Sequence, residues 1–161
     1  MAHIRCGTGN QFAQYRLGKL LLKGDDGIPK DVITAIRWLT AAAKQENGYA
    51  EYALALVYLT GEDAPKDSVK ALSLLKRSAG RGNQFAQYRL GKLLLQGEDA
   101  PKDVKAAIRW LTAAAEQGNQ YAQYALGKLY LLGKEVPKDR SSAIKWFQLA
   151  ADQAMNMLNI S

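Results

Sequence analysis

The apolar positions of the chain recur in two alternating patterns, which are clearest between Asn83 and Gly118. Apolar residues at helical spacing follow Asn83, and this stripe stops near Gly97, where a left-handed backbone costs least. A second stripe begins at Val104, with apolar residues at offsets 0, 3, 4, 7, 10 and 11. The side-chain oxygens of Asn83 and Asp103 can cap the first free N–H groups of a helix. The pattern predicts one helix from Asn83 to about Gly97 and a second from Asp103 to Gly118.

This helix pair is repeated along the chain. Proline recurs every 36 residues, at Pro29, Pro65, Pro101 and Pro137, which indicates stacked supersecondary units. We expect four units, at 10–46, 47–82, 83–118 and 119–153. Residues 1–9 are expected to be the remnant of a preceding helix or a tag, and 154–161 a decayed repeat or C-terminal cap. Short connections force antiparallel neighbours, so the predicted fold class is all-α, built from four antiparallel helix pairs.

Small residues recur inside the helices, where they allow close packing. In the first helix of the units they are Gly18, Ala55, Gly91 and Gly127. Large residues of the second helix are expected to fill the space opposite them: Trp38, Leu74, Trp110 and Trp146. Small side chains that face large ones let helices interdigitate without voids.

The recurring residues resemble a known family. Ala86, Leu90-Gly91, Gly97, Asp103, Ala106-Ala107, Trp110, Ala114-Ala115 and Gly118 are similar to the Sel1-like repeat, a relative of the tetratricopeptide repeat. The segment GNQYAQYALGKLYLLGKEVPKD is also similar to repeats appended to plasmid-mobilisation relaxases of Gram-positive bacteria. The first resemblance covers essentially the whole chain, and it implies a right-handed superhelical solenoid that scaffolds protein complexes. The near-identity of the first and third units also fits recent duplication or design.

The resemblance to tetratricopeptide-like solenoids implies that the first helix of each pair lines a concave groove. Residues at fixed offsets from the aromatic that starts each first helix would then point into it. The predicted groove residues are Phe12, Tyr15, Lys19, Tyr49, Tyr52, Phe85, Tyr88, Lys92, Leu95, Tyr121, Tyr124 and Lys128. Tyrosine offers a large contact area with a polar tip, and lysine selects carboxylate or phosphate. An acidic, partly apolar peptide is therefore the expected ligand.

Two alternatives apply to these groove residues. Periodic aromatics usually belong to a core, so Tyr15, Tyr52, Tyr88 and Tyr124 can instead pack between successive first helices. The lysines can equally be solvated and non-specific. Further basic residues, among them Arg16, Arg37 and Arg109, are predicted to lie outside the groove.

Composition and charge indicate a globular protein that favours acidic partners. The chain has 161 residues, of which 48% are hydrophobic and 23% charged, as in globular proteins. Its formal net charge of +7 favours acidic partners, whether protein, nucleic acid or an anionic surface. No apolar run is long enough to span a bilayer, and the first residues lack the apolar centre of a secretory signal. The single cysteine excludes an internal disulfide framework, and a cytoplasmic location is expected.

The sequence offers no constellation for catalysis, so we expect a protein that is not an enzyme. His3 is the single histidine and lies in the leading fragment, so we expect neither a histidine-based triad nor a multi-histidine metal site. Cys6 is expected to be a small apolar contact or an unpacked thiol. Acidic pairs such as Glu98-Asp99 recur in the loops, and solvated turns explain them better than cation sites, which need several converging oxygens. No cofactor is expected.

The predicted function is a protein-protein interaction scaffold that binds a peptide or partner surface in its groove. The alternative is a basic accessory module that contacts nucleic acid in a plasmid-mobilisation context, which the charge and the second resemblance favour. Homo-oligomerisation through exposed terminal repeats is a third possibility. Nucleic-acid binding should weaken steeply with salt, whereas a groove that buries tyrosine and leucine should be less sensitive.

Overall fold

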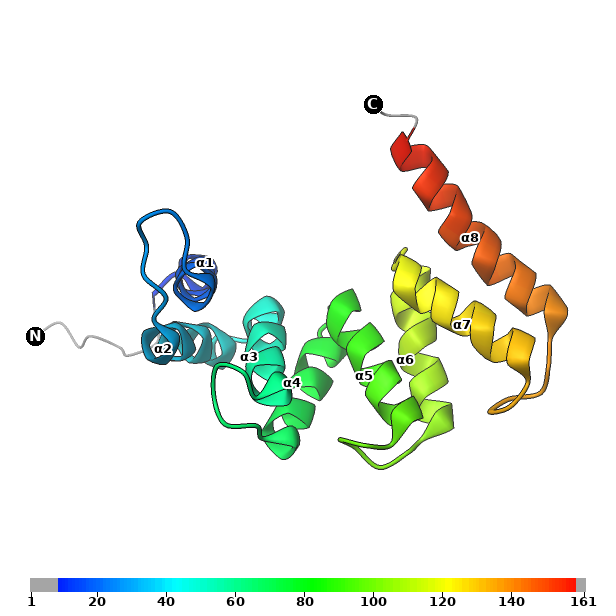
Figure 1. The fold of residues 1–161 in the computed structure, drawn as a ribbon, viewed down its shortest axis with the longest axis horizontal. Helices are drawn as coiled ribbons and strands as arrows, with labels where there is room; N and C mark the ends of the chain where they lie inside the picture. The colour runs from blue at the N-terminus through cyan, green and yellow to red at the C-terminus, as the bar shows by residue number, and fades with distance from the viewer. Residues whose placement is uncertain (1–8, 159–161) are drawn as a thin grey trace, which may run out of the picture. The chain divides into compact units, whose positions relative to one another are not determined.

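The computed structural model describes residues 9–158, and side chains as far as residue 153. This part of the chain forms eight helices, joined in pairs by loops (Figure 1). They are α1 (Gln11–Lys23), α2 (Val32–Lys44), α3 (Gly48–Thr60), α4 (Ser68–Gly80), α5 (Gln84–Gln96), α6 (Val104–Glu116), α7 (Gln120–Leu132) and α8 (Arg140–Leu158). Residues 9–158 contain no strand, only an isolated bridge between Asp25 and Ile28. The predicted all-α fold of four helix pairs is confirmed.

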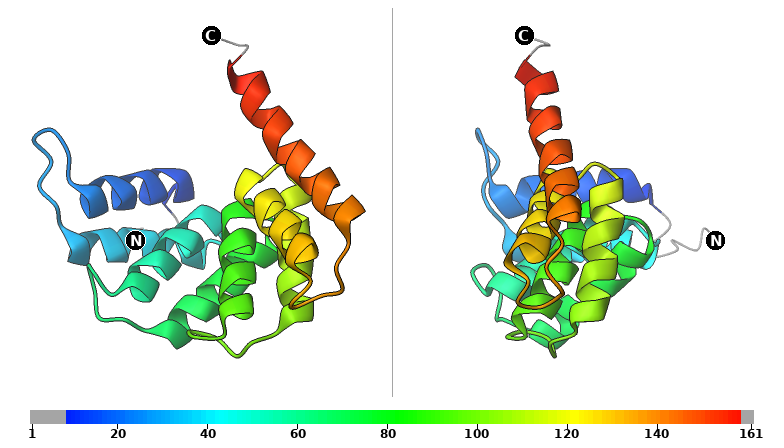
Figure 2. Two further views of the ribbon diagram at one scale, coloured as in Figure 1. Left: turned by 45° about the vertical axis from the view of Figure 1, so that its right-hand side comes forward. Right: turned by 90° about the vertical axis from the view of Figure 1, so that its right-hand side faces the viewer.

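The chain divides into two compact units, of which the first ends at Asn83 and the second begins at Gln84. In the first unit α1 packs against α2, α2 against α3, and α3 against α4. In the second unit α5, α6, α7 and α8 pack in the same consecutive order. Figure 1 shows α7 between α6 and α8, and Figure 2 shows the same helices from two further sides. Within each unit, consecutive helices therefore contact each other, as expected for stacked repeats.

Side-chain caps define where the helices begin. Asp103 has extended backbone angles, and its carboxylate accepts a hydrogen bond from the backbone N–H of Ala106 at 3.0 Å. The equivalent aspartates Asp31, Asp67 and Asp139 cap α2, α4 and α8 through the same kind of contact. The predicted start of the second helix of the pair is confirmed. An aspartate after each proline satisfies an N–H group that would otherwise lack a partner.

The dipeptide Gly118-Asn119 ends one helix and starts the next, as predicted. Gly118 has a φ of 93°, and its N–H donates to the Ala115 carbonyl at 3.0 Å. The N–H of Asn119 donates to the Ala114 carbonyl at 3.1 Å. The side chain of Asn119 then accepts from the N–H of Ala122 at 2.9 Å. This is a Schellman-type ending followed directly by an N-cap.

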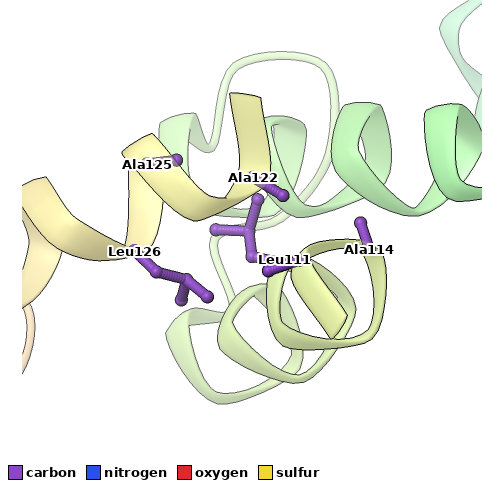
Figure 3. Packing of buried hydrophobic residues seen from close by; sticks show 6 residues of the cluster. Leu111, Ala114, Ala122, Ala125 and Leu126 are labelled. Carbon is purple, nitrogen blue, oxygen red and sulfur yellow. The ribbon is translucent and has the colours of Figure 1, made fainter. Parts of the chain in front are cut away.

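The core of the second unit lies between α6 and α7. Leu111, Ala114, Ala122 and Leu126 are almost fully buried there, and Figure 3 shows Leu111 lying against Ala122. Tyr88, Leu95, Ile108, Leu129, Tyr130 and Trp146 are partly buried and pack around this cluster. Burying a leucine side chain contributes about 2 kcal/mol. Small alanines bring the two helices close enough for the leucines to fill the space between them.

The residues that face the helix glycines differ from the prediction. A Cβ added to Gly91 would lie 2.7 Å from Cγ of Leu111, and one added to Gly18 would lie 2.7 Å from Cγ of Leu39. Both leucines are fully buried, whereas Trp38, next to Leu39, is 37% exposed. The tryptophans therefore do not fill the space opposite the glycines. At 100° per residue, a shift of one position turns a side chain away from the helix pair, which the stripe alone did not resolve.

The two ends of the chain differ in how much the structure describes. The predicted leading segment 1–9, including His3 and Cys6, lies outside the described residues except for Gly9. At the other end, helix α8 continues without a break to Leu158, through the start of the predicted decayed repeat. Ala154 stands where the third unit has Gly118, so the left-handed glycine that ends α6 has no counterpart.

Candidate binding surface

The predicted groove residues all lie on α1, α3, α5 and α7, the first helix of each pair. We call this set of side chains the first-helix face: Phe12, Tyr15, Lys19, Tyr49 and Tyr52 in the first unit, and Phe85, Tyr88, Lys92, Leu95, Tyr121, Tyr124 and Lys128 in the second. The two halves of this face are described separately because they belong to different units.

In the first unit, Tyr15 of α1 and Tyr49 of α3 lie side by side. Their ring centroids are 5.8 Å apart, with the planes tilted by 39°. Tyr15 is half-buried, whereas Tyr49 is 55% exposed and Phe12 is 62% exposed. The structure thus brings aromatic residues of consecutive repeats into contact and leaves large apolar rings open to solvent. Tilted ring pairs at this separation are favourable beyond the area they bury.

The second unit repeats this arrangement. The rings of Tyr88 and Tyr121 are 5.9 Å apart, and those of Tyr124 and Phe147 are 5.7 Å apart. Tyr121 is 69% exposed. Tyr88 and Leu95 instead pack against the α6–α7 core cluster. The inner tyrosine of each pair therefore contributes to packing, and the outer aromatic presents its surface to solvent.

Lys92 of α5 and Lys128 of α7 are the basic members of this face in the second unit. The Lys128 Nζ lies 4.9 Å from the centroid of the Tyr124 ring, a cation–π contact. Burial lowers the pKa of Lys92, and the positive charge of Lys128 lowers it further. Neither amine has an ion-pair partner within the described residues. The two charges are near enough to interact, and no carboxylate of the described chain compensates them.

An open hollow of about 700 Å³ lies beside α1 in the first unit. It is lined by Tyr15, Arg16, Lys19, Leu20, Leu22, Lys23, Asp25, Lys30 and Asp63. Arg16, which was predicted to lie outside the groove, lines this hollow together with Lys19, a predicted groove residue. Arg16 is four positions after Phe12, and the helical stripe of offsets 3, 4 and 7 would have included it.

The acidic loops are tied to lysines of neighbouring repeats. Lys30 of the first loop pairs with Asp63 of the second at 2.5 Å, and Lys102 of the third pairs with Glu135 of the fourth at 2.8 Å. These carboxylates are thus partly neutralised and not simply solvated.

No group of three or more His, Cys, Asp or Glu side chains that could hold a metal ion occurs within the described part of the chain. No helix in that part is long and apolar enough to cross a membrane.

Comparison with known proteins places this geometry in a family. The family model described as "Sel1 repeat" matches residues 11–47, 48–83, 84–119 and 120–155. A comparison with curated proteins found no match.

Solved structures of similar fold come from several bacteria. One is a protective antigen present in uropathogenic Escherichia coli strains that displays an SLR fold, with a TM-score of 0.85 and 34% identity over 90% of this chain. Another is a Sel1 repeat protein from Oxalobacter formigenes, with a TM-score of 0.82 and 30% identity over 89% of this chain. The chain spans 31% of the first protein and 57% of the second. Four matched repeats that cover nearly the whole sequence, together with the helix pairs of the structure, show that the chain belongs to the Sel1 repeat family.

Proposed function

We propose that this chain is a non-catalytic scaffold that binds a protein partner through the first-helix face. Sel1 repeat proteins are generally protein-interaction scaffolds. The observation that carries the proposal is the exposure of aromatic rings next to lysines that lack acidic partners. In the first unit the rings of Phe12 and Tyr49 are exposed, and Lys19 lines a hollow with Tyr15, whose ring contacts that of Tyr49. In the second unit the ring of Tyr121 is exposed, and the exposed ring of Tyr124 lies 4.9 Å from the Lys128 Nζ.

The chemistry of this face suits an acidic segment with some apolar side chains. Exposed tyrosine and phenylalanine supply contact area with little loss of side-chain entropy, and they are enriched at interfaces. Uncompensated lysines attract carboxylates and speed their association. An acidic peptide would satisfy both groups at once, whereas a purely apolar partner would leave buried amines without a counter-charge.

The test replaces residues of the face and follows the proteins that the chain captures from the source cell. The variant Lys92→Glu/Lys128→Glu reverses the charge of both lysines of the first-helix face in the second unit. The variant Tyr121→Ser removes an exposed ring of the same face. Arg109→Glu, on an exposed position of α6, makes a comparable charge change outside the face. We expect the first two variants to lose partners that the wild-type chain and Arg109→Glu retain. Equal capture by all four proteins would reject the second-unit half of the first-helix face as the binding surface.

The nucleic-acid alternative stays a prediction, and the same proteins test it. Titration against duplex and single-stranded DNA at two salt concentrations separates the two functions. Binding through phosphate contacts falls steeply as salt rises, because counterions are released on association. Tight DNA binding with such a salt dependence, lost equally in Arg109→Glu and in the face variants, would favour the nucleic-acid function.

A further inference from the structure

The hollow beside α1 is lined by more cationic than acidic side chains. Four cationic side chains line it: Arg16, Lys19, Lys23 and Lys30. Two of them are matched, because Lys23 lies 3.4 Å from a carboxylate oxygen of Asp25 and Lys30 pairs with Asp63. Arg16 and Lys19 have no ion pair within the described residues. The hollow therefore keeps two uncompensated positive charges.

These two charges lie on one face of one helix. Arg16 and Lys19 are separated by three positions on α1, so their side chains project from neighbouring turns toward the same side. The guanidinium can hold a carboxylate through two parallel hydrogen bonds, and the lysine adds a mobile charge beside it. Together they can bind one carboxylate jointly or two successive carboxylates.

The loop that follows α1 contributes Asp25 and Lys30 to the lining of the hollow, and backbone hydrogen bonds brace it. Asp25 and Ile28 exchange backbone hydrogen bonds at 3.1 and 2.5 Å, and Gly27 between them has a φ of 86°. The N–H of Asp31 donates to the Leu21 carbonyl at 2.9 Å, which ties the end of the loop to α1. This loop is one residue longer than the loop of the second repeat, GDDGIPKD against GEDAPKD. The first repeat thus has a loop that its neighbours do not reproduce.

The hollow also has apolar surface. Leu20 is exposed and Leu22 half-buried, and both belong to its lining. Tyr15 lies in the same lining, with its ring held against Tyr49. Burial raises the pKa of Tyr15, so its hydroxyl is protonated at neutral pH and can donate a hydrogen bond to an anion. Polar donors beside aliphatic surface are the usual make-up of a ligand site.

We propose that this hollow binds an acidic peptide segment of a partner protein, with its carboxylates on Arg16 and Lys19 and an adjacent apolar side chain on Leu20 and Leu22. The inference rests on the proposed function and gives it a position and a ligand chemistry. Asp25 and Asp63 interrupt the positive charge of the lining, so the hollow matches the continuous negative charge of a nucleic-acid backbone less well than it matches separate carboxylates. A peptide carries its charges singly, so it can place them between the carboxylates.

The test measures binding of a labelled synthetic peptide that alternates glutamate and leucine, in the full chain. A second peptide has glutamine in place of every glutamate. The variant Arg16→Glu/Lys19→Glu reverses the two free charges of the hollow. Arg37→Glu reverses an exposed charge on α2, outside the lining, and Lys92→Glu/Lys128→Glu reverses the pair in the second unit. Circular dichroism of each variant verifies that the helices remain.

We expect Arg16→Glu/Lys19→Glu to weaken binding of the acidic peptide about tenfold or more, since both contacts become repulsive. Arg37→Glu should bind as the wild type does, and the glutamine peptide should bind weakly to every protein. If only Lys92→Glu/Lys128→Glu loses binding, the hollow is not the site, although the proposed function stands. If no variant loses binding, both proposals fail. If Arg37→Glu loses as much peptide binding as Arg16→Glu/Lys19→Glu, the net charge of the protein alone attracts the peptide, and the hollow is not the site.

Discussion

Glu51 of α3 is fully buried, and one of its carboxylate oxygens lies 2.6 Å from Nε of Arg81. The other oxygen has no hydrogen-bond partner and lies 3.6 Å from Nε of Arg77. The first and third repeats have glutamines at the two equivalent positions, Gln14 with Gln45 and Gln87 with Gln117, each pair joined by a 2.8 Å hydrogen bond. The second repeat thus replaces a neutral amide pair by an ion pair at the same place in the fold.

Removing one partner of this ion pair should cost far more than exchanging both. Arg81→Gln leaves the Glu51 carboxylate buried without its main counter-charge, and we expect a loss of about 3 kcal/mol in the free energy of unfolding. The Arg81 side chain is 32% exposed, so water limits the loss. The double variant Glu51→Gln/Arg81→Gln recreates the amide pair and should unfold within about 1 kcal/mol of the wild type. Urea unfolding of both single variants and the double variant forms the cycle. Additive losses would contradict the pairing.

Glu46 has a left-handed backbone, with a φ of 65°, where the second and third repeats have Gly82 and Gly118 at 94° and 93°. A side chain with a Cβ costs about 1 kcal/mol in this region, and glycine avoids the cost. Glu46→Gly should therefore raise the free energy of unfolding by about 1 kcal/mol. The ion pair lost with it is small, since the Glu46 carboxylate is mostly exposed and 3.7 Å from Arg81.

Gly118→Ala is the matched change in the opposite direction, since it puts a Cβ where φ is 93°. We expect it to lower the free energy of unfolding by about 1 kcal/mol. Thermal or urea unfolding measures both variants. A stabilised Gly118→Ala, or a destabilised Glu46→Gly, would contradict the explanation by backbone strain.

Gly91 lies on the side of α5 that packs against α6, and a larger side chain there should push the two helices apart. An added Cβ lies 2.7 Å from Cγ of Leu111 and 3.1 Å from the Ala107 carbonyl oxygen. We expect Gly91→Leu to destabilise the protein by about 1–3 kcal/mol. Gly80→Leu is the control, because a Cβ on Gly80 meets nothing within 4 Å. A thermal melt in which Gly91→Leu matches the wild type would show that the contact can relax.

The pKa of Lys92 should depend on Lys128. Burial lowers this pKa first and the Lys128 charge second, so Lys128→Gln should raise it without restoring the ordinary value of 10.5. Because the folded state holds the charged amine less well than the unfolded chain, stability should increase as pH rises from the lowered pKa toward 10.5. NMR titration of the lysine side chains measures the pKa. Lys134→Gln, in the exposed α7–α8 loop, removes the same charge as a control and should leave it unchanged.

Local interactions made much of the fold predictable. Caps and glycines act within a few residues, so Asp103 and Gly118 marked the ends of α6 from sequence, and the 36-residue spacing of the prolines marked the pairs. The family resemblance indicated which helix of each pair carries the predicted groove residues. The residue that packs against Gly91 could not be predicted from local interactions. Neighbouring side chains on a helix point about 100° apart, so only the packing of α5 against α6 determines that Leu111, and not Trp110, faces Gly91.

The chain by itself determined the repeat, its helix boundaries and its family, because these depend on backbone propensities that each repeat expresses locally. Only the tertiary structure decided which charged side chains meet. Arg16 joins Lys19 in one hollow, Lys30 meets Asp63 of the next repeat, and Glu51 meets Arg81. The ion pairs Lys30–Asp63 and Glu51–Arg81 join residues about thirty positions apart, so they depend on how helices pack and not on the periodicity of any one helix. We propose Arg16, Lys19, Lys92 and Lys128, which have no ion-pair partner within the described residues, as the charges that meet a partner protein.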